Sequence, residues 1–357
     1  ARLALDDFRI AVEDADVRVL VHSGDFAAEA EALREEFGLL TICFDGATGP
    51  ASHDYRSLLD ATSPEPVRRP GDAEDPAWIT YTSGTTGRPK GIVLTHRAIR
   101  EVALNLALEF GPRDPGEQIV LTQPLSHGSG YFVLPFLMSG GGLAILKRFD
   151  PERVFALSQR PEVRTLKLVP TMLAKLLEHD SGAPFRYDTV IYGAAPIPAP
   201  VLEASLDRFG PVLAQIYGQS EAPVTLTCLS KREHEGDGDQ RFSAGRAWRS
   251  VAVEVCGPDG TALPPGERGE VMVSGSHLMS GYHNRPQETA EVLTQDGWLR
   301  TRDIGVMDER GYVFLLGRSD EMIISGGFNI APREVEQILT NHPAVEEVCV
   351  LGLPDPH

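Results

Sequence analysis

The sequence predicts an α/β protein. We expect a large N-terminal domain of α/β subdomains with parallel-type sheets plus an antiparallel β subdomain, and a small α+β C-terminal domain that is only begun. Up to about residue 217, short β-rich runs alternate with helical patterns, which is typical of parallel β units covered by helices on both faces. After about residue 246, tight turns separate the strand-like runs, which is typical of antiparallel hairpins.

Strands and helices are expected in alternation over the first two hundred residues. The expected strands lie at 18–21, 78–81, 119–121, 143–146, 166–169, 188–192 and 213–217. The expected helices lie at 27–37, 95–110, 171–178 and 199–209. The strand at 78–81 runs into a Gly-rich loop, and we expect a helix to follow that loop.

The pattern changes in the last third of the chain. Strands are expected at 251–255, 269–274 and 312–315, with turns at Pro258-Asp259-Gly260 and Asp308-Glu309-Arg310-Gly311. A helix is expected to begin at Pro332 and end at Thr340, because proline suits the first position of a helix. A further strand is expected at 345–350.

The expected domain boundary lies at residues 317 and 318. Residues 1–317 form the large domain, whose N-terminal part we expect to be missing, with a β-rich subdomain at about 246–317. Residues 318–357 form a hinge and the start of the small domain. About 40 residues cannot bury a core alone, so the small domain looks cut short.

Charge and composition exclude two classes of protein. The net charge of −18 argues against non-specific nucleic-acid binding, since a phosphate backbone would be repelled. No run of about 18 apolar residues exists, so no membrane span is expected. The most apolar stretch, Tyr131–Leu146, is interrupted by proline and glycine, and we expect it to be core.

The cysteines and the first residues favour a cytoplasmic protein. The first residues do not look like a signal peptide. The four cysteines are scattered without C-x-x-C spacing, which argues against a zinc site or a disulfide framework and suits a reducing cytosol; they are Cys43, Cys228, Cys256 and Cys349.

The Gly-rich loop is Tyr81-Thr82-Ser83-Gly84-Thr85-Thr86-Gly87-Arg88-Pro89-Lys90-Gly91. Glycines let backbone N–H groups converge on an anion, hydroxyls donate further hydrogen bonds, and Lys90 adds positive charge. The order is not the Walker pattern, because a proline rather than a glycine precedes the lysine. The loop therefore predicts phosphate binding, and the alternative is a plain Gly-rich turn.

Six motifs in order resemble the adenylate-forming superfamily, which contains acyl-CoA synthetases, nonribosomal peptide adenylation domains and beetle luciferases. The first is the loop just described. The others are Pro124-Leu125-Ser126-His127-Gly128-Ser129-Gly130, Gly193-Ala194-Ala195-Pro196, Tyr217-Gly218-Gln219-Ser220-Glu221, Thr301-Arg302-Asp303, and Gly317-Arg318-Ser319-Asp320 with Gly326-Gly327-Phe328-Asn329-Ile330. The resemblance covers nearly the whole chain.

The resemblance implies a role for each matching residue. Lys90, Ser220 and Glu221 are the expected catalytic residues, with Glu221 on Mg²⁺ and Ser220 at the α-phosphate. The other expected nucleotide and coenzyme A residues are Thr82, Ser83, Gly84, Thr85, Thr86, Gly87, Gly193, Ala194, Ala195, Tyr217, Gly218, Gln219, Asp303, Arg318, Gly326 and Gly327. The acyl pocket is expected at His127, Gly193 and Gln215, and the hinge at Asp320.

Structural alternatives exist for several of these residues. Glu221 and Asp320 could be ordinary surface or loop acids, and Asp303 a turn aspartate. The remaining alternatives are a core aromatic for Tyr217, a structural ion pair for Arg318, and a packed histidine for His127.

The resemblance implies a two-step reaction with ATP, Mg²⁺ and coenzyme A. A substrate carboxylate displaces pyrophosphate from ATP, and the coenzyme A thiol then displaces AMP. The expected partners are a small carboxylic acid, ATP and coenzyme A, with no nucleic acid and no membrane span; a homodimer is left open. A carrier protein as acceptor, as in an adenylation domain or a fatty acyl-AMP ligase, stays an alternative, as does a non-catalytic nucleotide-binding module.

No position matches the lysine that the family carries near the end of its small domain. We therefore expect this chain to be poor at adenylation, and an extended version with that lysine to be faster. The identity of the acyl substrate is left open by the sequence.

Overall fold

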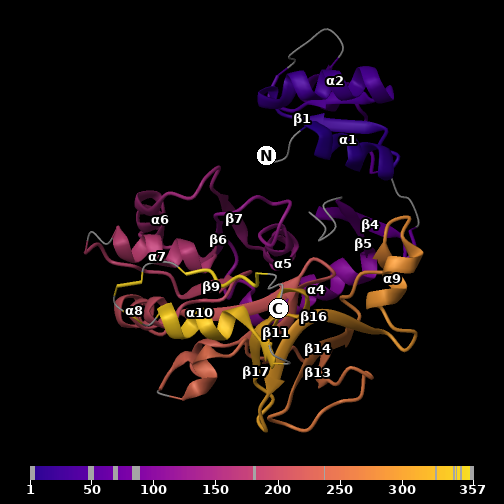
Figure 1. The fold of residues 1–357 in the computed structure, drawn as a ribbon. Helices are drawn as coiled ribbons and strands as arrows, with labels where there is room; N and C mark the ends of the chain where they lie inside the picture. The colour runs from indigo at the N-terminus through magenta and orange to yellow at the C-terminus, as the bar shows by residue number, and fades with distance from the viewer. Residues whose placement is uncertain are drawn as a thin grey trace. The chain divides into compact units, whose positions relative to one another are not determined.

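The computed structural model describes residues 5–46, 52–66, 71–82, 89–179, 182–236, 238–325, 328–340, 342, 344–345 and 348–353. The chain folds into two compact units (Figure 1). The first unit comprises Ala1–His96 and Met279–Thr289, and the second comprises Arg97–Leu278 and Ala290–His357. The expected boundary at residues 317 and 318 is a different division, and it stays a prediction.

The first unit contains a three-stranded parallel sheet with three helices. The strands are β1 (Val19–His22), β2 (Leu40–Cys43) and β3 (His53–Asp54), and the helices are α1 (Leu5–Asp14), α2 (Ala27–Phe37) and α3 (Tyr55–Ala61). Helix α2 has the predicted bounds, and it ends at Gly38, whose φ of 68° suits glycine. Val12, Leu33 and Leu39 form the core of this unit.

A second, antiparallel sheet of the first unit corrects the expected course of the Gly-rich loop. Its order is β15–β5–β4, with β4 at Pro76–Thr82, β5 at Lys90–Thr95 and β15 at Gly281–Tyr282. The loop therefore joins two strands of a hairpin, and strand β5, which was not predicted, lies between the loop and the helix expected at 95–110, which begins at His96. Ile92 and Leu94 are fully buried, and this β-forming segment pairs with β4 before the next helix begins.

The second unit is built on a seven-stranded sheet of order β12–β11–β10–β9–β8–β6–β7. The strands are β6 (Gln118–Leu121), β7 (Gly142–Ile145), β8 (Val163–Leu168), β9 (Thr189–Gly193), β10 (Leu213–Gln219), β11 (Ala222–Leu229) and β12 (Arg246–Ala247). The five strands from β7 to β10 are parallel, which confirms the predicted parallel-type sheet, and β11 and β12 are antiparallel.

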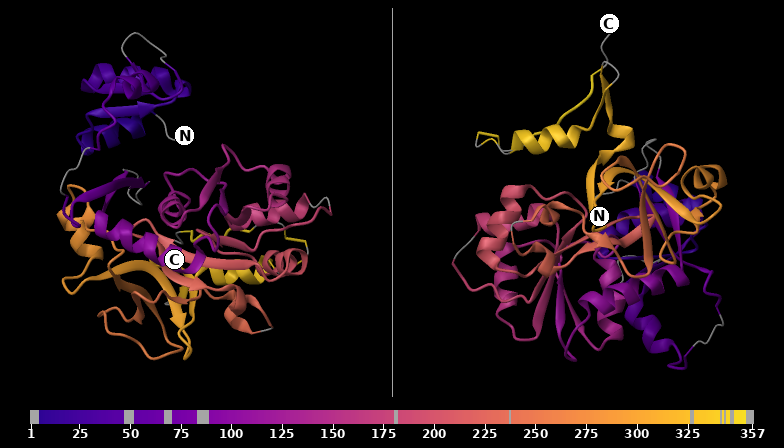
Figure 2. Two further views of the ribbon diagram at one scale, coloured as in Figure 1. Left: turned by 180° about the vertical axis from the view of Figure 1, so that it is seen from behind. Right: turned by 90° about the horizontal axis from the view of Figure 1, so that it is seen from below.

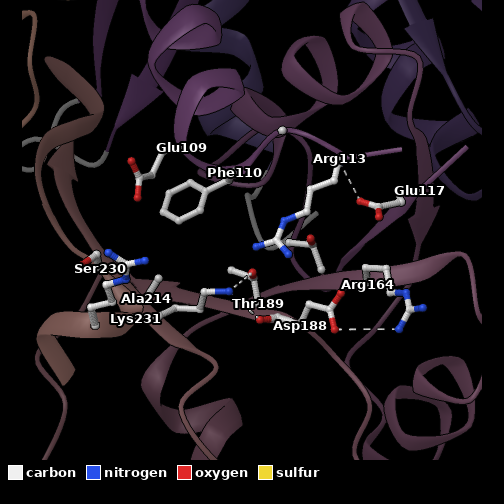
Figure 3. A pocket seen from close by; sticks show the side chains of 13 residues that line it. Glu109, Phe110, Arg113, Glu117, Arg164, Asp188, Thr189, Ala214, Ser230 and Lys231 are labelled. Carbon is white, nitrogen blue, oxygen red and sulfur yellow. Dashed lines mark hydrogen bonds and ion pairs between the residues drawn. The ribbon is translucent and has the colours of Figure 1, made fainter. Parts of the chain in front are cut away.

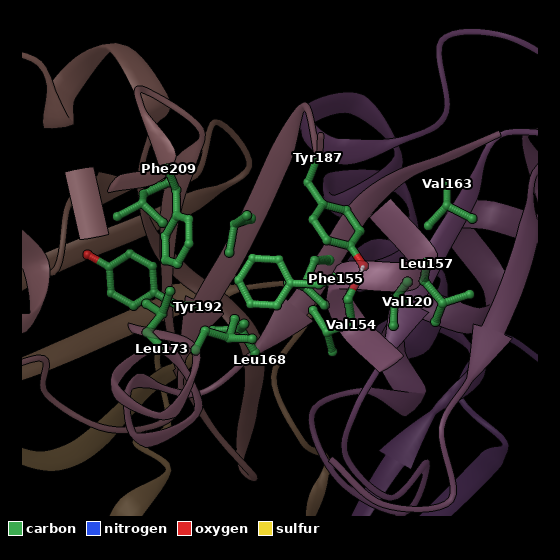
Figure 4. Close-up of a cluster of buried hydrophobic side chains, with 14 of the residues drawn as sticks. Val120, Val154, Phe155, Leu157, Val163, Leu168, Leu173, Tyr187, Tyr192 and Phe209 are labelled. Carbon is green, nitrogen blue, oxygen red and sulfur yellow. Dashed lines mark hydrogen bonds between the residues drawn. The ribbon is translucent and has the colours of Figure 1, made fainter. Parts of the chain in front are cut away.

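Helices lie on both sides of the seven-stranded sheet (Figure 2). They are α4 (His96–Phe110), α5 (Val133–Met138), α6 (Pro151–Ser158), α7 (Pro170–Glu178) and α8 (Ala199–Phe209). Helices α6, α7 and α8 cover one face of β8 and β9 and form the main core, in which Phe155, Leu173 and Phe209 meet Leu168 and Tyr192 (Figure 4).

The apolar stretch at 131–146 is core only in part. Phe132 and Phe136 are buried, but Leu137 and Met138 on α5 are exposed. A short helix buries only one side of its surface, so a run that is apolar throughout must leave some side chains outside.

The predicted antiparallel subdomain is a four-stranded sheet of order β13–β14–β16–β17. Its strands are β13 (Val251–Cys256), β14 (Arg268–Gly275), β16 (Trp298–Met307) and β17 (Val313–Arg318), and all neighbours are antiparallel. Between β14 and β16 the chain passes through β15 and α9 (Pro286–Val292).

The last described segments follow β17. They are a short 3₁₀ turn at Ser319–Glu321, the hairpin of β18 (Ile323–Ser325) and β19 (Phe328–Ile330), and α10 (Pro332–Thr340). Helix α10 has the predicted bounds. The strand expected at 345–350 was wrong for residues 345 and 348–350, which lie in no strand. In the described part of the chain, no helix is long and apolar enough to cross a membrane.

Candidate nucleotide site

The predicted adenine-side residues lie at the carboxyl edge of the seven-stranded sheet. Gly193 ends β9, and Tyr217 to Gln219 end β10. Ligands of α/β sheets bind at this edge, because the loops that leave the parallel strands surround a crevice there.

Two of these positions have room only for glycine. A Cβ atom on Gly193 would lie 2.2 Å from the carbonyl oxygen of Ile216 on the neighbouring strand. A Cβ on Gly218 would lie 2.3 Å from the backbone nitrogen of Val224. The register of β10 against β11 shifts between Tyr217 and Gln219, so the strand ends in a bulge that brings the backbones together.

Among the described residues of the second unit, three non-glycine residues hold left-handed backbone conformations, which such residues rarely adopt. They are Ala194 (φ 69°), Val224 (φ 47°) and Arg302 (φ 62°). Ala194 and Arg302 belong to predicted nucleotide-binding motifs, and Val224 packs beside Gly218. Strained backbone of this kind concentrates at functional sites, where the surrounding structure fixes it.

Tyr217, Asp303 and Arg318 come from three strands and meet in space. The Tyr217 hydroxyl donates a hydrogen bond to Oδ2 of Asp303. Nη1 of Arg318 lies 3.4 Å from Oδ1 of the same carboxylate, because Asp303 on β16 is paired with Arg318 on β17. Three residues that the sequence assigned to one nucleotide are thus neighbours.

The electrostatics of this cluster are dominated by burial and by carboxylates. Burial raises the pKa of Tyr217 well above its ordinary value, and the negative charge of Asp303 raises it further. Burial lowers the pKa of Arg318, but the carboxylates of Asp303, Asp320 and Glu221 outweigh burial and raise that pKa overall. Arg318 is therefore a fixed cation among three acids.

The predicted hinge residue is part of the same cluster. Asp320 lies in the short turn after β17, and its Oδ1 is 3.6 Å from Nε of Arg318. Arg318 thus contacts both Asp303, the residue predicted to bind the ribose, and Asp320, the predicted hinge residue. The glycines at 326 and 327, expected at the pantetheine tunnel, lie outside the described residues.

Glu221 is the one predicted magnesium ligand. In the described part of the chain, no group of three or more His, Cys, Asp or Glu side chains could hold a metal by itself. A single partly exposed carboxylate beside a strand end is nevertheless a fitting donor, because Mg²⁺ accepts one carboxylate plus phosphate oxygens and water.

Lys90 belongs to the first unit and makes an ion pair there. Its ammonium group contacts the carboxylate of Glu288 on α9 and lies 5.4 Å from the ring centre of Tyr282. Arg285 lies 3.7 Å from the same carboxylate. Thr82 ends β4, whereas the loop residues Ser83, Gly84, Thr85, Thr86 and Gly87 lie outside the described residues.

The predicted acyl-side residues have different environments. His127 is exposed, and its Nδ1 lies 2.9 Å from the Ser126 hydroxyl. Gln215 is hydrogen-bonded to the buried hydroxyl of Tyr192, at 2.9 Å. Because Gln215 pairs with Tyr192 and Ile216 with Gly193, the side chain of Gln215 lies on the opposite face of the sheet from Ile216 and Gly193.

His234 completes a buried network that the motifs did not indicate. Its Nδ1 lies 2.9 Å from the Ser230 carbonyl, which can only accept, so Nδ1 carries the proton. Burial lowers the pKa of His234, so the ring is neutral and Nε2 accepts from the Tyr192 hydroxyl 2.9 Å away. Oε1 of Gln215 is a second acceptor for the Tyr192 hydroxyl, which has a single proton to share between Gln215 and His234.

Lys167 is a second residue that sequence patterns missed. It lies on β8 between the buried Leu166 and Leu168 and is itself fully buried. Its ammonium donates to Oε1 of Gln123 (3.1 Å) and to the Leu168 carbonyl (3.0 Å). Burial lowers its pKa to about 8. Because β8 also carries the polar residues Arg164 and Thr165, sequence patterns held no signal that singled out Lys167.

The comparisons with known proteins identify the class. A protein-family model described as AMP-binding enzyme matches residues 1–283. The chain therefore belongs to the AMP-binding enzyme family, and its relatives make it a member of the acyl-CoA synthetase type of adenylate-forming enzymes. This confirms the resemblance and the α/β fold class predicted from the motifs.

The curated relatives include several acid–CoA ligases. Feruloyl-CoA synthase of Amycolatopsis is 36% identical, over 99% of this chain and 70% of that protein. The medium/long-chain-fatty-acid–CoA ligase FadD8 of Mycobacterium tuberculosis is 40% identical, over 78% of this chain and 48% of that protein. The chain thus spans about half of the mycobacterial ligase and 70% of the feruloyl-CoA synthase.

Solved structures share the fold over nearly the whole chain. The amide bond synthetase McbA of Marinactinospora thermotolerans superposes with a TM-score of 0.89 at 31% identity, covering 99% of this chain and 70% of that one. ATP-bound MatB of Rhodopseudomonas palustris gives 0.88 at 28% identity, with the same two coverages.

Proposed function

We propose that the protein activates a carboxylic acid with ATP and transfers the acyl group to coenzyme A. The observation that carries this proposal is the cluster in which Tyr217, at the end of β10, meets Asp303 on β16 and Arg318 on β17. The curated relatives of the chain include acid–CoA ligases. The small-molecule partners are the acid, ATP and coenzyme A. A homodimer and a cytoplasmic location stay predictions.

In the first step, an oxygen of the substrate carboxylate attacks the α-phosphorus of ATP. The bond from that phosphorus to the bridging oxygen breaks, and pyrophosphate leaves with its electron pair. A carboxylate is already ionised near pH 7, so this attack needs no general base. Catalysis therefore comes from positioning and from stabilising charge on the phosphates.

The nucleoside is held by the cluster around Asp303. The ribose hydroxyls donate to the Asp303 carboxylate, which Tyr217 and Arg318 hold in place beforehand. The ring of Tyr217 stacks on adenine. Gly193, Ala194, Ala195, Gly218 and Gln219 form the adenine side, where two backbones approach too closely for any side chain.

The phosphates are held by the Gly-rich loop, Lys90 and Ser220. The ammonium group of Lys90 pairs with Glu288, which holds this cation at the end of the loop. Glu221 offers the carboxylate oxygen for Mg²⁺, which when bound offsets negative charge on the phosphates.

In the second step, the thiol of coenzyme A attacks the acyl carbonyl carbon and loses its proton. The bond from that carbon to the phosphate oxygen breaks, and AMP leaves. Asp320 is the hinge for the rotation between the two steps, and Gly326 and Gly327 line the approach of the thiol. The ion pair of Asp320 with Arg318 supports this role, because it links the hinge to the nucleotide cluster.

Pyrophosphate exchange with a panel of carboxylic acids tests the first step. Whole protein with ATP and Mg²⁺ is expected to exchange labelled pyrophosphate into ATP only when its acid is present. Exchange with no acid of the panel would favour the non-catalytic nucleotide-binding module instead.

Acceptor assays test the second step. The expected result is a thioester with coenzyme A. An acyl-adenylate that reacts only with a carrier protein would favour an adenylation domain or a fatty acyl-AMP ligase. Amines belong in the same panel, because one similar structure is an amide bond synthetase.

A further inference from the structure

A cavity of about 350 Å³ lies at the amino edge of the seven-stranded sheet, entirely within the second unit. Its walls come from the starts of β8, β9 and β10, from the turn after β11, and from the end of α4 with the residues that follow it (Figure 3). The candidate nucleotide residues lie at the carboxyl edge of the same strands. The cavity is therefore separate from the proposed active site.

Four basic residues line this cavity, namely Arg113, Arg164, Lys231 and Arg232, and Arg164 lies 3.8 Å from Asp188. Figure 3 shows the guanidinium of Arg113, after α4, and the ammonium of Lys231, after β11, directed into the same space. The ammonium donates to the Asp188 carbonyl at 3.0 Å and to the Thr189 hydroxyl at 3.2 Å. Burial lowers the pKa of Lys231, and the positive charge of Arg113 lowers it further. The two cations therefore repel each other across the cavity.

Three acids also line the cavity, namely Glu109, Glu117 and Asp188. Glu117 accepts the backbone N–H of Arg113 at 2.9 Å, and Asp188 lies 3.8 Å from Arg164. Asp188 and Glu109 attract the proton of Lys231, yet its pKa stays lowered. In the described part of the chain, no side chain is hydrogen-bonded or ion-paired to the Arg113 guanidinium. An anion between the two cations would remove their repulsion.

We propose that this cavity binds a small molecule that carries a phosphate group, held between Arg113 and Lys231. A tetrahedral dianion can accept from the planar fork of an arginine and from a lysine ammonium at once. The Thr189 hydroxyl, which accepts from Lys231, keeps its own proton to donate. A cavity of 350 Å³ exceeds the space of a bare phosphate and lies in the range of small-ligand sites. Phe110 gives it an apolar wall for the organic part.

The setting makes the paired cations unusual. The chain carries a net charge of −18, which repels anions over most of the surface. A site that binds a phosphate monoester against this background needs a local pair of cations, and the cavity has one. The proposal does not rest on the proposed ligase function, since a chain without turnover would bind the same ligand.

Calorimetric titration of the whole protein with glycerol 3-phosphate tests the proposal, with glycerol as the neutral control. The expected result is binding of the phosphate ester and none of glycerol. Arg113→Gln and Lys231→Met are each expected to weaken binding at least tenfold. Arg153→Gln on α6 and Lys175→Met on α7 make the same charge changes outside the cavity and are expected to leave binding unchanged.

Three outcomes would overturn the proposal. The first is that glycerol 3-phosphate does not bind the parent protein. The second is that Arg113→Gln and Lys231→Met bind it as tightly as the parent does. The third is that inorganic phosphate binds and glycerol 3-phosphate does not. Circular dichroism and the melting temperature check that all four variants fold. A ligand at the nucleotide site would be weakened by Asp303→Asn and not by the cavity variants, so the two sites are distinguishable.

Discussion

The carboxylate of Asp303 is shared between two neighbours. Tyr217 donates to one oxygen, and Arg318 lies 3.4 Å from the other. Because Arg318 also contacts Asp320, a change at Asp303 alters the charge balance of the proposed hinge as well.

Asp303→Asn is therefore expected to weaken ATP binding by about 30- to 100-fold, which corresponds to about 2–3 kcal/mol for lost charge-assisted hydrogen bonds. Calorimetric titration with ATP measures this directly. Tyr217→Phe is the matched control, because it removes one neighbour of Asp303 and keeps the carboxylate, so a smaller loss is expected. If the affinity for ATP is unchanged in Asp303→Asn, Asp303 does not bind the nucleotide.

The buried side chain of His277 is expected to make the free energy of unfolding depend on pH in the acidic range. It is fully buried, and neither ring nitrogen has a hydrogen-bond partner in the described structure. Burial lowers its pKa to about 4 from 6.5. Between these values the unfolded chain binds a proton that the folded chain does not, so the free energy of unfolding falls as the pH drops from 6.5 towards 4.

Because of His277, we expect the free energy of unfolding to be about 2 kcal/mol lower at pH 5 than at pH 7, by the linkage relation. Urea denaturation at both pH values measures it, and His277→Leu is expected to lose this part of the pH dependence. His53→Leu changes an exposed histidine and serves as the control. An equal pH dependence in parent and His277→Leu would contradict the argument.

At the scale of elements, the ends of β9 and β10 are fixed by backbone contact. Gly193 and Gly218 sit where neighbouring main chains leave no space for a Cβ atom. Ala194, next to Gly193, holds a left-handed conformation. The position of the adenine-side segment therefore depends on how closely these strands approach.

Gly193→Ala is expected to lower the free energy of unfolding by about 2 kcal/mol, because the added methyl group meets a rigid backbone oxygen rather than a side chain that can move. Urea denaturation measures this, and nucleotide affinity should fall with it as Ala194 shifts. Gly71→Ala is the control, since its Cβ would lie 3.6 Å from the nearest atom, an ordinary contact. Equal losses in both variants would show that close approach is not the cause.

Sequence patterns predicted the elements that depend mainly on residues close together in the chain. The helices at 27–37 and 332–340 follow from helix-forming residues bounded by glycine or proline, and the structure has the same bounds. The hairpin at 82–90 was missed, because a phosphate loop suggests a strand followed by a helix, whereas pairing of β4 with β5 depends on register. Strand β11 was missed for the same reason: it pairs antiparallel with a parallel sheet.

The residues of the candidate site that belong to sequence motifs could be predicted. Residues that are notable only because they are buried could not. Tyr217, Asp303 and Arg318 were found from their motifs, and the structure brings them together. Lys167 and His234 were not found, because their burial results from packing between strands that are distant in sequence. Strand β8 holds other polar residues besides Lys167, so its sequence does not indicate which of these side chains is buried.

At the scale of the whole molecule, the excess of acids is the dominant electrostatic feature. The chain has 51 Asp and Glu against 33 Lys and Arg. Many of these charges form surface ion pairs, which contribute about 0–1 kcal/mol each. The unpaired surplus repels itself more in the compact state than in the unfolded chain, so it destabilises folding.

Salt is therefore expected to raise the melting temperature. The Debye length shrinks from about 30 Å at 0.01 M to about 8 Å at 0.15 M, which screens repulsion between distant acids while close ion pairs are screened less. A gain of about 1 kcal/mol corresponds to a rise of about 1 °C in the melting temperature of a chain of this size, because the entropy of unfolding grows with chain length. Calorimetry in sodium chloride measures this rise. Asp60, Glu267 and Glu309 are exposed, and replacing each by lysine changes the net charge by +2. The three replacements together take the net charge from −18 to −12, so the rise of the melting temperature with salt should be smaller. A melting temperature that falls with salt would mean that ion pairs outweigh the surplus of acids.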